Sequence, residues 1–202
     1  SPAMVVETSG TPLHWQILLS YLKQEGIVND DVYESVQDHD LPKTVRLSLH
    51  NRFNSEKSDG RPVDVVGFGC TSSVEESLSK AVGELLERYY LSHYKTQSLY
   101  VSSFEALGDA ALDLTELNTF QSWQMDRNTH LGWWADSEIR WVKGYDYFTN
   151  SLRYLPAQMV YWNYTYKENE SHIFDTNTSG CAGHFTRDEA ILGSLLELIE
   201  RD

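Results

Sequence analysis

The sequence predicts an α+β fold in which mixed sheet layers pack with helices and two strand–loop–helix units are structurally equivalent. Strand-like alternation of apolar and polar residues occurs at 45–53 and 138–147. Helical apolar spacing separates these stretches. A glycine-containing loop followed by a glutamate-rich helix occurs twice, at a constant offset of 113 residues (76 to 189, 84 to 197 and 87 to 200). Helix and strand signals in alternation argue against a helical bundle.

The first half of the chain is expected to contain two helices and two strands. Residues 13–25 space their apolar groups like an amphipathic helix, which Gly26 ends. Residues 45–53 form a strand and 54–62 a polar turn. A short Val-rich strand at 63–68 runs into Gly69, and the first repeat helix follows at 73–93.

The second half is expected to be richer in strands. Residues 102–117 are predicted as an irregular helix and 138–147 as a strand. A turn at 149–151 precedes one or two further strands within 154–166. A loop rich in Gly, Ser and Thr at 175–186 then leads into the second repeat helix.

Composition limits the classes of function. The chain has 202 residues, enough for one domain or two small ones, and 41% of them are hydrophobic. Its net charge of −14 argues against a nonspecific nucleic-acid binder, which needs a basic face. It does not exclude ATP, because Mg²⁺ can bridge an acidic protein and an anionic phosphate.

The chain carries few signals of secretion or of membrane insertion. Two cysteines make no disulfide framework, and no apolar run approaches the roughly 18 residues of a membrane span. No signal peptide opens the chain, so a cytoplasmic location is expected despite three glycosylation sequons. Apolar helical spacing continues to Arg201 without a C-cap signal, so we expect a fragment of a longer protein.

The two repeat helices present matched polar faces. Ser73 and Thr186 fit N-cap positions, with Glu76 and Glu189 three residues later as in a capping box. At about 100° per residue, Glu87 projects about 20° from Glu76 around the first helix. Apolar residues occupy the opposite arc of each helix.

The matched faces have two interpretations. In the simpler one, both faces are solvated and each Glu-x-x-x-Arg pair is an ordinary i,i+4 ion pair. In the other, the two faces meet and four carboxylates converge: Glu84, Glu87, Glu197 and Glu200. Hard oxygen ligands suit Mg²⁺ or Ca²⁺, whereas a di-iron site needs Glu-x-x-His. Arginine suits phosphate, so the pattern favours Mg²⁺ with a nucleotide.

Other candidate residues lie in the loops. Ser179 and Gly180 precede a helix start, where free N–H groups can hold phosphate, although no P-loop motif is present. Cys181 fits a buried thiol better than a nucleophile, and His184 fits a loop cap better than a phosphate ligand. The indole rings fit core packing better than a peptide-binding surface; they are Trp123, Trp133, Trp134, Trp141 and Trp162.

The two signatures resemble those of YcaO-domain proteins. The first is Gly67-Phe68-Gly69 with Glu75-Glu76-Ser77-Leu78 and Gly83-Glu84-Leu85-Leu86-Glu87-Arg88. The second runs from Thr178-Ser179-Gly180-Cys181-Ala182-Gly183 to Glu197-Leu198-Ile199-Glu200-Arg201-Asp202. The resemblance covers about 63–202, with 1–62 as an N-terminal helix and strand region, and implies that 1–202 is the N-terminal part of a YcaO-like domain. The chain has Phe185 where many members have asparagine.

The resemblance implies an ATP- and Mg²⁺-dependent enzyme that activates backbone amides of ribosomally made peptides. It implies that Glu84, Glu87, Glu197 and Glu200 bind Mg²⁺ and that Glu189 and Arg201 contact the nucleotide. Cyclodehydration of Cys, Ser or Thr to azolines is the expected reaction, with no catalytic side chain assigned. Thioamide or amidine formation and a non-catalytic scaffold are the alternatives. The expected partners are a peptide substrate, a leader-peptide-binding protein and a second copy in a homodimer, with neither nucleic acid nor membrane.

Overall fold

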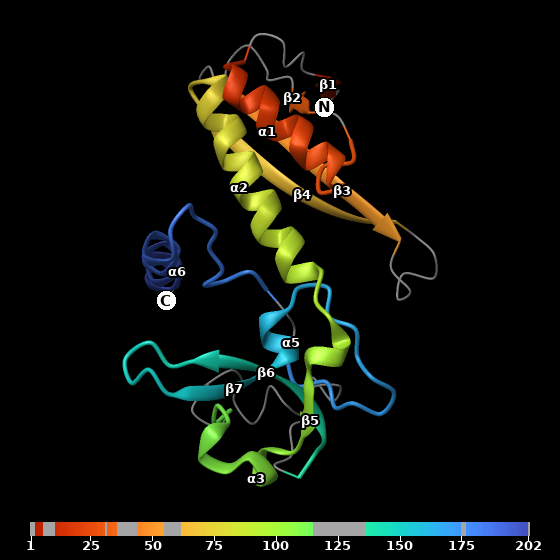
Figure 1. Ribbon diagram of the computed structural model, residues 1–202, viewed down its shortest axis with the longest axis vertical. Coiled ribbons are helices and arrows are strands. Elements are labelled where there is room, and N and C mark those ends of the chain that lie inside the picture. The colour runs from red at the N-terminus through yellow and green to blue at the C-terminus, as the bar shows by residue number, and fades with distance from the viewer. Residues whose placement is uncertain are drawn as a thin grey trace. The chain divides into compact units, whose positions relative to one another are not determined.

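The computed structural model describes residues 3–5, 11–30, 32–35, 44–54, 62–114, 136–174 and 177–201. The chain divides into two compact units. Unit 1 comprises Ser1–Tyr90 with Thr178–Asp202, and unit 2 comprises Leu91–Asn177. Each unit combines helices with an antiparallel sheet (Figure 1), so the predicted α+β class is confirmed. Both repeats of the Glu-x-x-Glu-Arg pattern fall within unit 1.

Unit 1 contains a four-stranded sheet in the order β1-β2-β3-β4. The strands are β1 (Ala3–Val5), β2 (Tyr33–Ser35), β3 (Val45–Asn54) and β4 (Pro62–Thr71). β3 and β4 pair along their whole length, from Val45 opposite Thr71 to Asn54 opposite Pro62. β4 is therefore longer than the predicted strand at 63–68, because each of its residues has a partner on β3. The predicted turn at 54–62 falls mostly outside the described residues.

Two helices pack on one face of this sheet (Figure 1): α1 (Leu13–Gln24) and α2 (Val74–Ser92). Alternation along the strands points one set of side chains toward the helices. The buried residues of this core are Trp15, Leu19, Leu22, Leu47, Leu49, Val65, Leu78, Ala81, Val82 and Leu85. Gly26 follows α1 with a φ of 70°, as expected of the glycine that ends this helix.

Two glycines let α2 approach β4 at backbone distance. A Cβ atom at Gly67 would lie 2.0 Å from the carbonyl oxygen of Ala81, and one at Gly69 would lie 1.7 Å from that of Ser77. Real side chains do not tolerate such distances, so only glycine fits at these two positions. The Gly-Phe-Gly segment thus fixes how the first repeat helix lies on its sheet.

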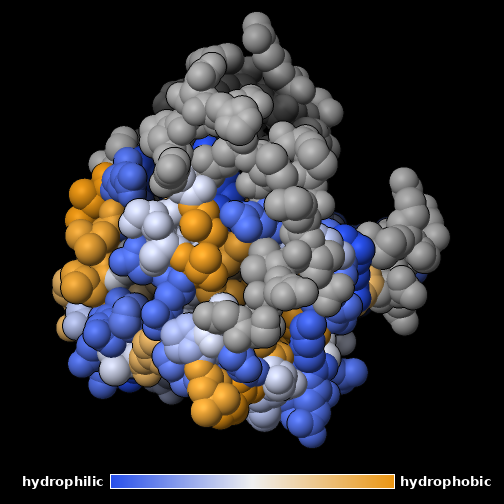
Figure 2. Space-filling model, turned by 90° about the horizontal axis from the view of Figure 1, so that it is seen from above, coloured by the Kyte–Doolittle hydropathy of each residue, from blue (hydrophilic) through white to orange (hydrophobic). Residues whose placement is uncertain are grey.

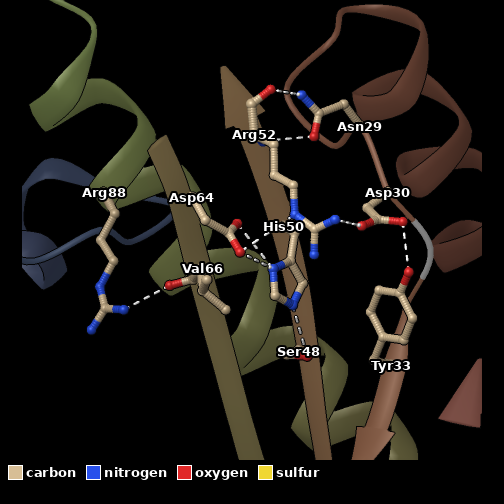
Figure 3. A network of polar contacts seen from close by, with 9 residues as sticks. All are labelled: Asn29, Asp30, Tyr33, Ser48, His50, Arg52, Asp64, Val66 and Arg88. Atoms are coloured by element: carbon tan, nitrogen blue, oxygen red, sulfur yellow. Dashed lines mark hydrogen bonds and ion pairs between the residues drawn. The ribbon is translucent and has the colours of Figure 1, made fainter. Parts of the chain in front are cut away.

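The opposite face of the sheet carries a polar network (Figure 3). His50 Nδ1 lies 2.9 Å from Asp64 Oδ2, which joins β3 to β4. Arg52 Nη1 forms an ion pair with Asp30 Oδ2 at 2.9 Å, and Tyr33 donates a hydrogen bond to the other oxygen of Asp30 at 2.7 Å. These contacts connect three strands to the segment that follows α1.

Unit 2 contains a three-stranded sheet in the order β5-β6-β7. Its strands are β5 (Tyr100–Ser102), β6 (Ile139–Tyr145) and β7 (Leu152–Pro156). Its helices are η3 (Thr96–Ser98), α3 (Phe104–Leu107), η4 (Gly108–Ala110) and α5 (Ala157–Val160). Trp141 is fully buried with Ile139 and Ala111, which supports core packing for this tryptophan. Trp123, Trp133 and Trp134 lie outside the described residues.

Two element predictions for unit 2 need correction. The irregular helix predicted at 102–117 is two short turns, α3 and η4, and residues 115–117 lie outside the described part. Of the one or two strands predicted within 154–166, only the end of β7 at 154–156 is present; α5 begins at Ala157, and no further strand occurs between there and residue 174. Pro156 explains the change, because proline cannot donate to a strand ladder and is favoured where a helix begins.

Unit 2 also buries an ion pair that the sequence analysis missed. The carboxylate of Glu170 is 1% exposed and lies 3.0 Å from Arg140 Nη2. Tyr164 donates to it at 2.8 Å, and the backbone N–H of Lys167 donates at 2.8 Å. Burial raises the pKa of Glu170, but these hydrogen bonds outweigh burial, and the net pKa is lowered. The charge of Glu170 is thus balanced by Arg140 and its oxygens accept hydrogen bonds, as the burial of a charged group requires.

The second repeat helix, α6 (Arg187–Arg201), belongs to unit 1 and differs from α2 in its surroundings. Residues 177–186 before it contain no strand, so the second repeat is a loop and a helix rather than a strand–loop–helix unit in the described chain. α6 has no buried residue. Apolar side chains reach the surface in patches (Figure 2), and α6 exposes Leu192, Leu195, Leu196, Leu198 and Ile199. No helix among the described residues is long and apolar enough to cross a membrane.

Candidate functional site

The two repeat helices begin in the same way. The backbone N–H of Glu76 donates to Ser73 Oγ at 3.2 Å, and that of Glu189 donates to Thr186 Oγ1 at 3.3 Å. Both predicted N-caps are therefore confirmed. The start of α6 has one further hydrogen bond, because Thr186 Oγ1 also donates to the carboxylate of Glu189 at 2.5 Å.

The two Glu-x-x-x-Arg pairs also match. Arg88 Nη2 lies 2.6 Å from Glu84 Oε1, and Arg201 Nη2 lies 2.7 Å from Glu197 Oε1. In each pair the other carboxylate oxygen accepts a backbone N–H from the segment before the helix, which is β4 in the first repeat and a loop in the second. The donor is Phe68 at 2.5 Å for the first glutamate and Gly180 at 3.1 Å for the second.

Each arginine of these pairs reaches the same place in its own repeat. Arg88 Nη1 donates to the carbonyl oxygen of Val66 at 2.6 Å (Figure 3), and Arg201 Nη1 donates to Ser179 Oγ at 2.9 Å. Val66 and Ser179 are themselves separated by the repeat offset (66 to 179). The sequence repeat is therefore also a repeat of contacts: an acid and a base four residues apart bind the segment that precedes their helix, a strand in the first repeat and a loop in the second.

The second loop lies against the first repeat helix. A Cβ atom at Gly183 would lie 3.6 Å from Glu87 Cβ and 3.6 Å from the carbonyl oxygen of Gly83. Gly180 has a φ of 75°, and a Cβ there would meet Leu198 at 3.0 Å. The loop thus runs from α6 to α2, and it brings the two glutamate-bearing faces into one neighbourhood.

Glu87 shows that the carboxylates interact. Burial raises its pKa, and the nearby charges of Glu197 and Glu84 raise it further; Arg88 and the backbone N–H of Gly183 only partly compensate. Two of the other predicted metal ligands therefore act on Glu87, and one of them lies on a helix far away in the sequence. Crowded carboxylates gain most from a bound cation.

The same residues are not arranged as a finished metal site. Glu200 is exposed. The described residues include no group of three or more His, Cys, Asp or Glu side chains that could hold a metal ion. Glu84 and Glu197 each bind one arginine and one backbone N–H instead. The donor chemistry nevertheless fits Mg²⁺, which takes carboxylate oxygens and needs only one or two from the protein when phosphate supplies the rest.

Cys181 lies close to these carboxylates. Burial raises the pKa of its thiol to about 11, and the charges of Glu87 and Glu197 contribute to the increase. A thiol with this pKa is protonated at neutral pH and is a poor nucleophile. The structure therefore supports the interpretation of Cys181 as an unreactive, half-buried thiol.

The predicted nucleotide contact Glu189 lies at the opposite end of α6 from Arg201. His184 Nδ1 lies 2.8 Å from Glu189 Oε2, a contact that agrees with the loop-cap interpretation of His184. Hydrogen bonding from Thr186 lowers the pKa of Glu189, and His184 lowers it further. Phe185, the departure from the usual asparagine, is 91% exposed.

Comparison with known proteins identifies the family. The protein-family model described as YcaO cyclodehydratase, ATP- and Mg²⁺-binding, matches residues 68–202. The chain belongs to the YcaO family, as its two signatures predicted. ATP and Mg²⁺, the predicted cofactors, are those that the family description names. No curated protein matches the chain.

Solved structures share the fold. YcaO from Methanopyrus kandleri, bound with AMPPCP and Mg²⁺, matches with a TM-score of 0.61 and 17% identity over 92% of this chain and 41% of its own. A heterocyclase in complex with substrate and cofactor matches with a TM-score of 0.66 and 18% identity over 98% of this chain and 29% of its own. The E. coli microcin synthetase McbBCD complex matches with a TM-score of 0.52 and 15% identity over 84% of this chain and 39% of its own. The chain thus spans less than half the length of these relatives, and the domain organisation predicted for residues 1–202 stays a prediction.

Sequence reasoning missed two features of this site. It did not foresee that Glu84 and Glu197 would each accept a backbone N–H from the segment before their helix, although Gly67 and Gly180 share the repeat offset and marked those segments. It also did not pair His184 with Glu189. A spacing of five residues across a helix start gives no sequence signal, because His184 precedes the N-cap and lies outside the helical register.

Proposed function

We propose that this chain takes part in ATP- and Mg²⁺-dependent activation of peptide backbone amides, by cyclodehydration of Cys, Ser or Thr residues to azolines. The observation that carries the proposal is the crowding of Glu87 with Glu84 and Glu197 across two equivalent helices. A cation relieves this repulsion, and a triphosphate supplies the anion that such a cation needs.

The proposed roles follow from the position of each group. Glu84, Glu87, Glu197 and Glu200 hold Mg²⁺, and this requires the Glu84 and Glu197 carboxylates to release their arginines in part. Arg88 and Arg201 are then free to approach phosphate oxygens, which the guanidinium group suits. When bound, Mg²⁺ neutralises the charge of the phosphoryl group that ATP transfers to the amide oxygen. The backbone N–H groups of Ser179 and Gly180 hold phosphate oxygens in this proposal, which requires the Gly180 N–H to leave Glu197 Oε2, to which it donates at 3.1 Å.

The protein mainly positions its reactants in this scheme. A substrate thiol or hydroxyl adds to the preceding carbonyl carbon, the former amide oxygen takes the phosphoryl group, and phosphate leaves as the ring C=N bond forms. Two of the solved neighbours are a heterocyclase in complex with substrate and a microcin synthetase complex. These neighbours support proposing a peptide substrate and a partner protein for this chain as well.

The experiment is ATP turnover by the intact protein with a Cys-containing peptide. Glu87→Gln and Glu200→Gln should each lower turnover on the order of 100-fold or more, because the metal supplies several kcal/mol of charge stabilisation. Glu76→Gln, an exposed substitution on α2 outside the proposed site, is the matched control and should leave turnover unchanged. Unchanged turnover in both site variants would reject the proposal.

A non-catalytic scaffold of the same fold is the second candidate. The pairing of Glu84 and Glu197 with arginines and the exposed Phe185 favour it. Calorimetry separates the two, because a scaffold need not bind the ATP analogue AMPPCP in a Mg²⁺-dependent way.

A further inference from the structure

The starts of α2 and α6 differ at the position two residues before the N-cap. In α2 this residue is Thr71, whose hydroxyl accepts from the Ser73 N–H at 3.2 Å and hydrogen-bonds with Ser77 Oγ at 2.9 Å. In α6 it is His184, whose Nδ1 lies 2.8 Å from Glu189 Oε2. The same position thus stabilises the helix start in one repeat and holds a carboxylate in the other.

The Glu189 carboxylate is oriented by two contacts on one oxygen. Thr186 Oγ1 donates to Oε2 at 2.5 Å, and His184 Nδ1 approaches the same atom. Two partners on Oε2 restrict rotation of the carboxylate, and Oε1 is then the oxygen that a ligand can reach. A binding group held in place by its neighbours loses less conformational freedom when the ligand arrives.

The position of Glu189 along α6 limits what it can bind. Glu189 precedes Glu197 by eight residues (189 to 197), about 12 Å along a helix. A carboxylate only accepts hydrogen bonds and repels phosphate. If the metal and phosphates lie near Glu197, the partner that suits Glu189 is a donor at the far end of the nucleotide, such as a ribose hydroxyl or a base amino group.

We propose that His184 is a positioning residue that holds Glu189 for the nucleoside part of the bound nucleotide. This inference rests on the proposed function. It assigns no bond between His184 and the nucleotide: His184 acts through Glu189, together with the N-cap hydroxyl of Thr186.

The test is calorimetric titration of the intact protein with AMPPCP and Mg²⁺. His184→Ala should raise Kd about fivefold, the scale of one exposed charged contact. His184→Gln, whose amide can donate to the carboxylate, should recover most of the affinity. The double variant His184→Ala with Glu189→Gln should bind no more weakly than Glu189→Gln alone, because a residue that acts through another adds nothing once that residue is lost.

His14→Ala is the matched control. His14 is an exposed residue of α1, and its Nε2 lies 3.6 Å from Glu75 Oε1. Like His184, it therefore lies beside a carboxylate in the first turn of a helix, in this case α2. It should leave Kd unchanged. Thermal melting of each variant, followed by circular dichroism, should show no loss of fold, since His184 and Glu189 are 46% and 53% exposed.

The outcomes separate this inference from the proposed function. Absence of Mg²⁺-dependent binding in the unsubstituted protein rejects the proposed function, and this inference with it. Binding that His184→Ala leaves unchanged overturns this inference alone. Additive losses in the double variant also overturn it, because they would mean that His184 acts independently of Glu189.

Discussion

The two repeat helices of unit 1 share their polar contacts and differ in their burial. Both have a hydroxyl N-cap, an i,i+4 Glu–Arg pair and a glutamate that accepts a backbone N–H from the preceding segment. Leu85 of α2 is 0% exposed, whereas Leu198, its equivalent on α6 (85 to 198), is 47% exposed. The polar contacts form whether the segment before the helix is a strand or a loop, whereas burial needs a sheet, and of the two repeat helices only α2 lies on one in the described chain.

Substituting one glycine before each repeat helix should give the largest difference between the two repeats. Gly69→Ala should destabilise the chain by more than about 3 kcal/mol, beyond the usual range for overpacking, because the new Cβ meets a backbone oxygen that cannot move aside. Gly180→Ala should cost only about 1–2 kcal/mol, the penalty for a left-handed backbone with a flexible leucine nearby. Urea denaturation measures both. Equal costs would show that α2 does not contact β4 as described.

Truncation of the equivalent leucines should give the next largest difference. Leu85→Ala should lower the free energy of unfolding by about 2–5 kcal/mol, as expected for a buried leucine. Leu198→Ala should cost less than about 1 kcal/mol, since a half-exposed side chain leaves a smaller cavity. If Leu198→Ala proved as costly as Leu85→Ala in urea denaturation, the apolar face of α6 would have to be covered in solution.

Neutralising Glu87 should stabilise the protein slightly and abolish its proposed activity. Its folded-state pKa is raised, so the folded chain binds this proton more tightly than the unfolded chain, and stability falls as pH rises through the interval between the two pKa values. At neutral pH the charge is therefore unfavourable, and Glu87→Gln should raise Tm by about 2–4 °C if roughly 1 kcal/mol of repulsion is removed. Scanning calorimetry at pH 7 without Mg²⁺ tests this. A lower Tm, with Glu76→Gln unchanged, would contradict the repulsion.

The two cysteines should differ in reactivity, with no effect on stability. Cys70 is exposed, and a hydrogen bond from Thr44 lowers its pKa, with Arg46 and Lys80 contributing. The pKa of Cys181 is about 11, so only about one thiol in a thousand is ionised at pH 8. Iodoacetamide at pH 8, followed by peptide mass spectrometry, should label Cys70 first. Both should react alike in denaturant, and faster labelling of Cys181 in the folded chain would place it away from Glu87 and Glu197.

Prediction from sequence succeeded where the signal was local. The helices at 13–25 and 73–93 and the strand at 45–53 match α1, α2 and β3 closely, because periodicity reports a buried face directly. It was wrong after Pro156, where apolar residues that suit a strand continue into α5. Short apolar runs do not distinguish a strand from a buried helical turn.

The candidate site was predicted in part. The N-caps and the Glu–Arg register follow from spacing along one helix, and the contacts confirm both. The convergence of Glu84, Glu87 and Glu197 was one of two open interpretations, because periodicity places a face on a helix but does not say what it meets. The roles of these glutamates as Mg²⁺ ligands stay a prediction.

By itself the sequence determined the repeated polar pattern and the two signatures that define the YcaO family, because a helix fixes which side chains lie three and four residues apart. Only the tertiary structure decided that the loop at Gly183 contacts α2 beside Glu87 and that β4 buries α2 but not α6. The first of these facts depends on segments about one hundred residues apart (87 to 183) meeting in space, and the second on which helix packs against the sheet; no local rule of spacing encodes either.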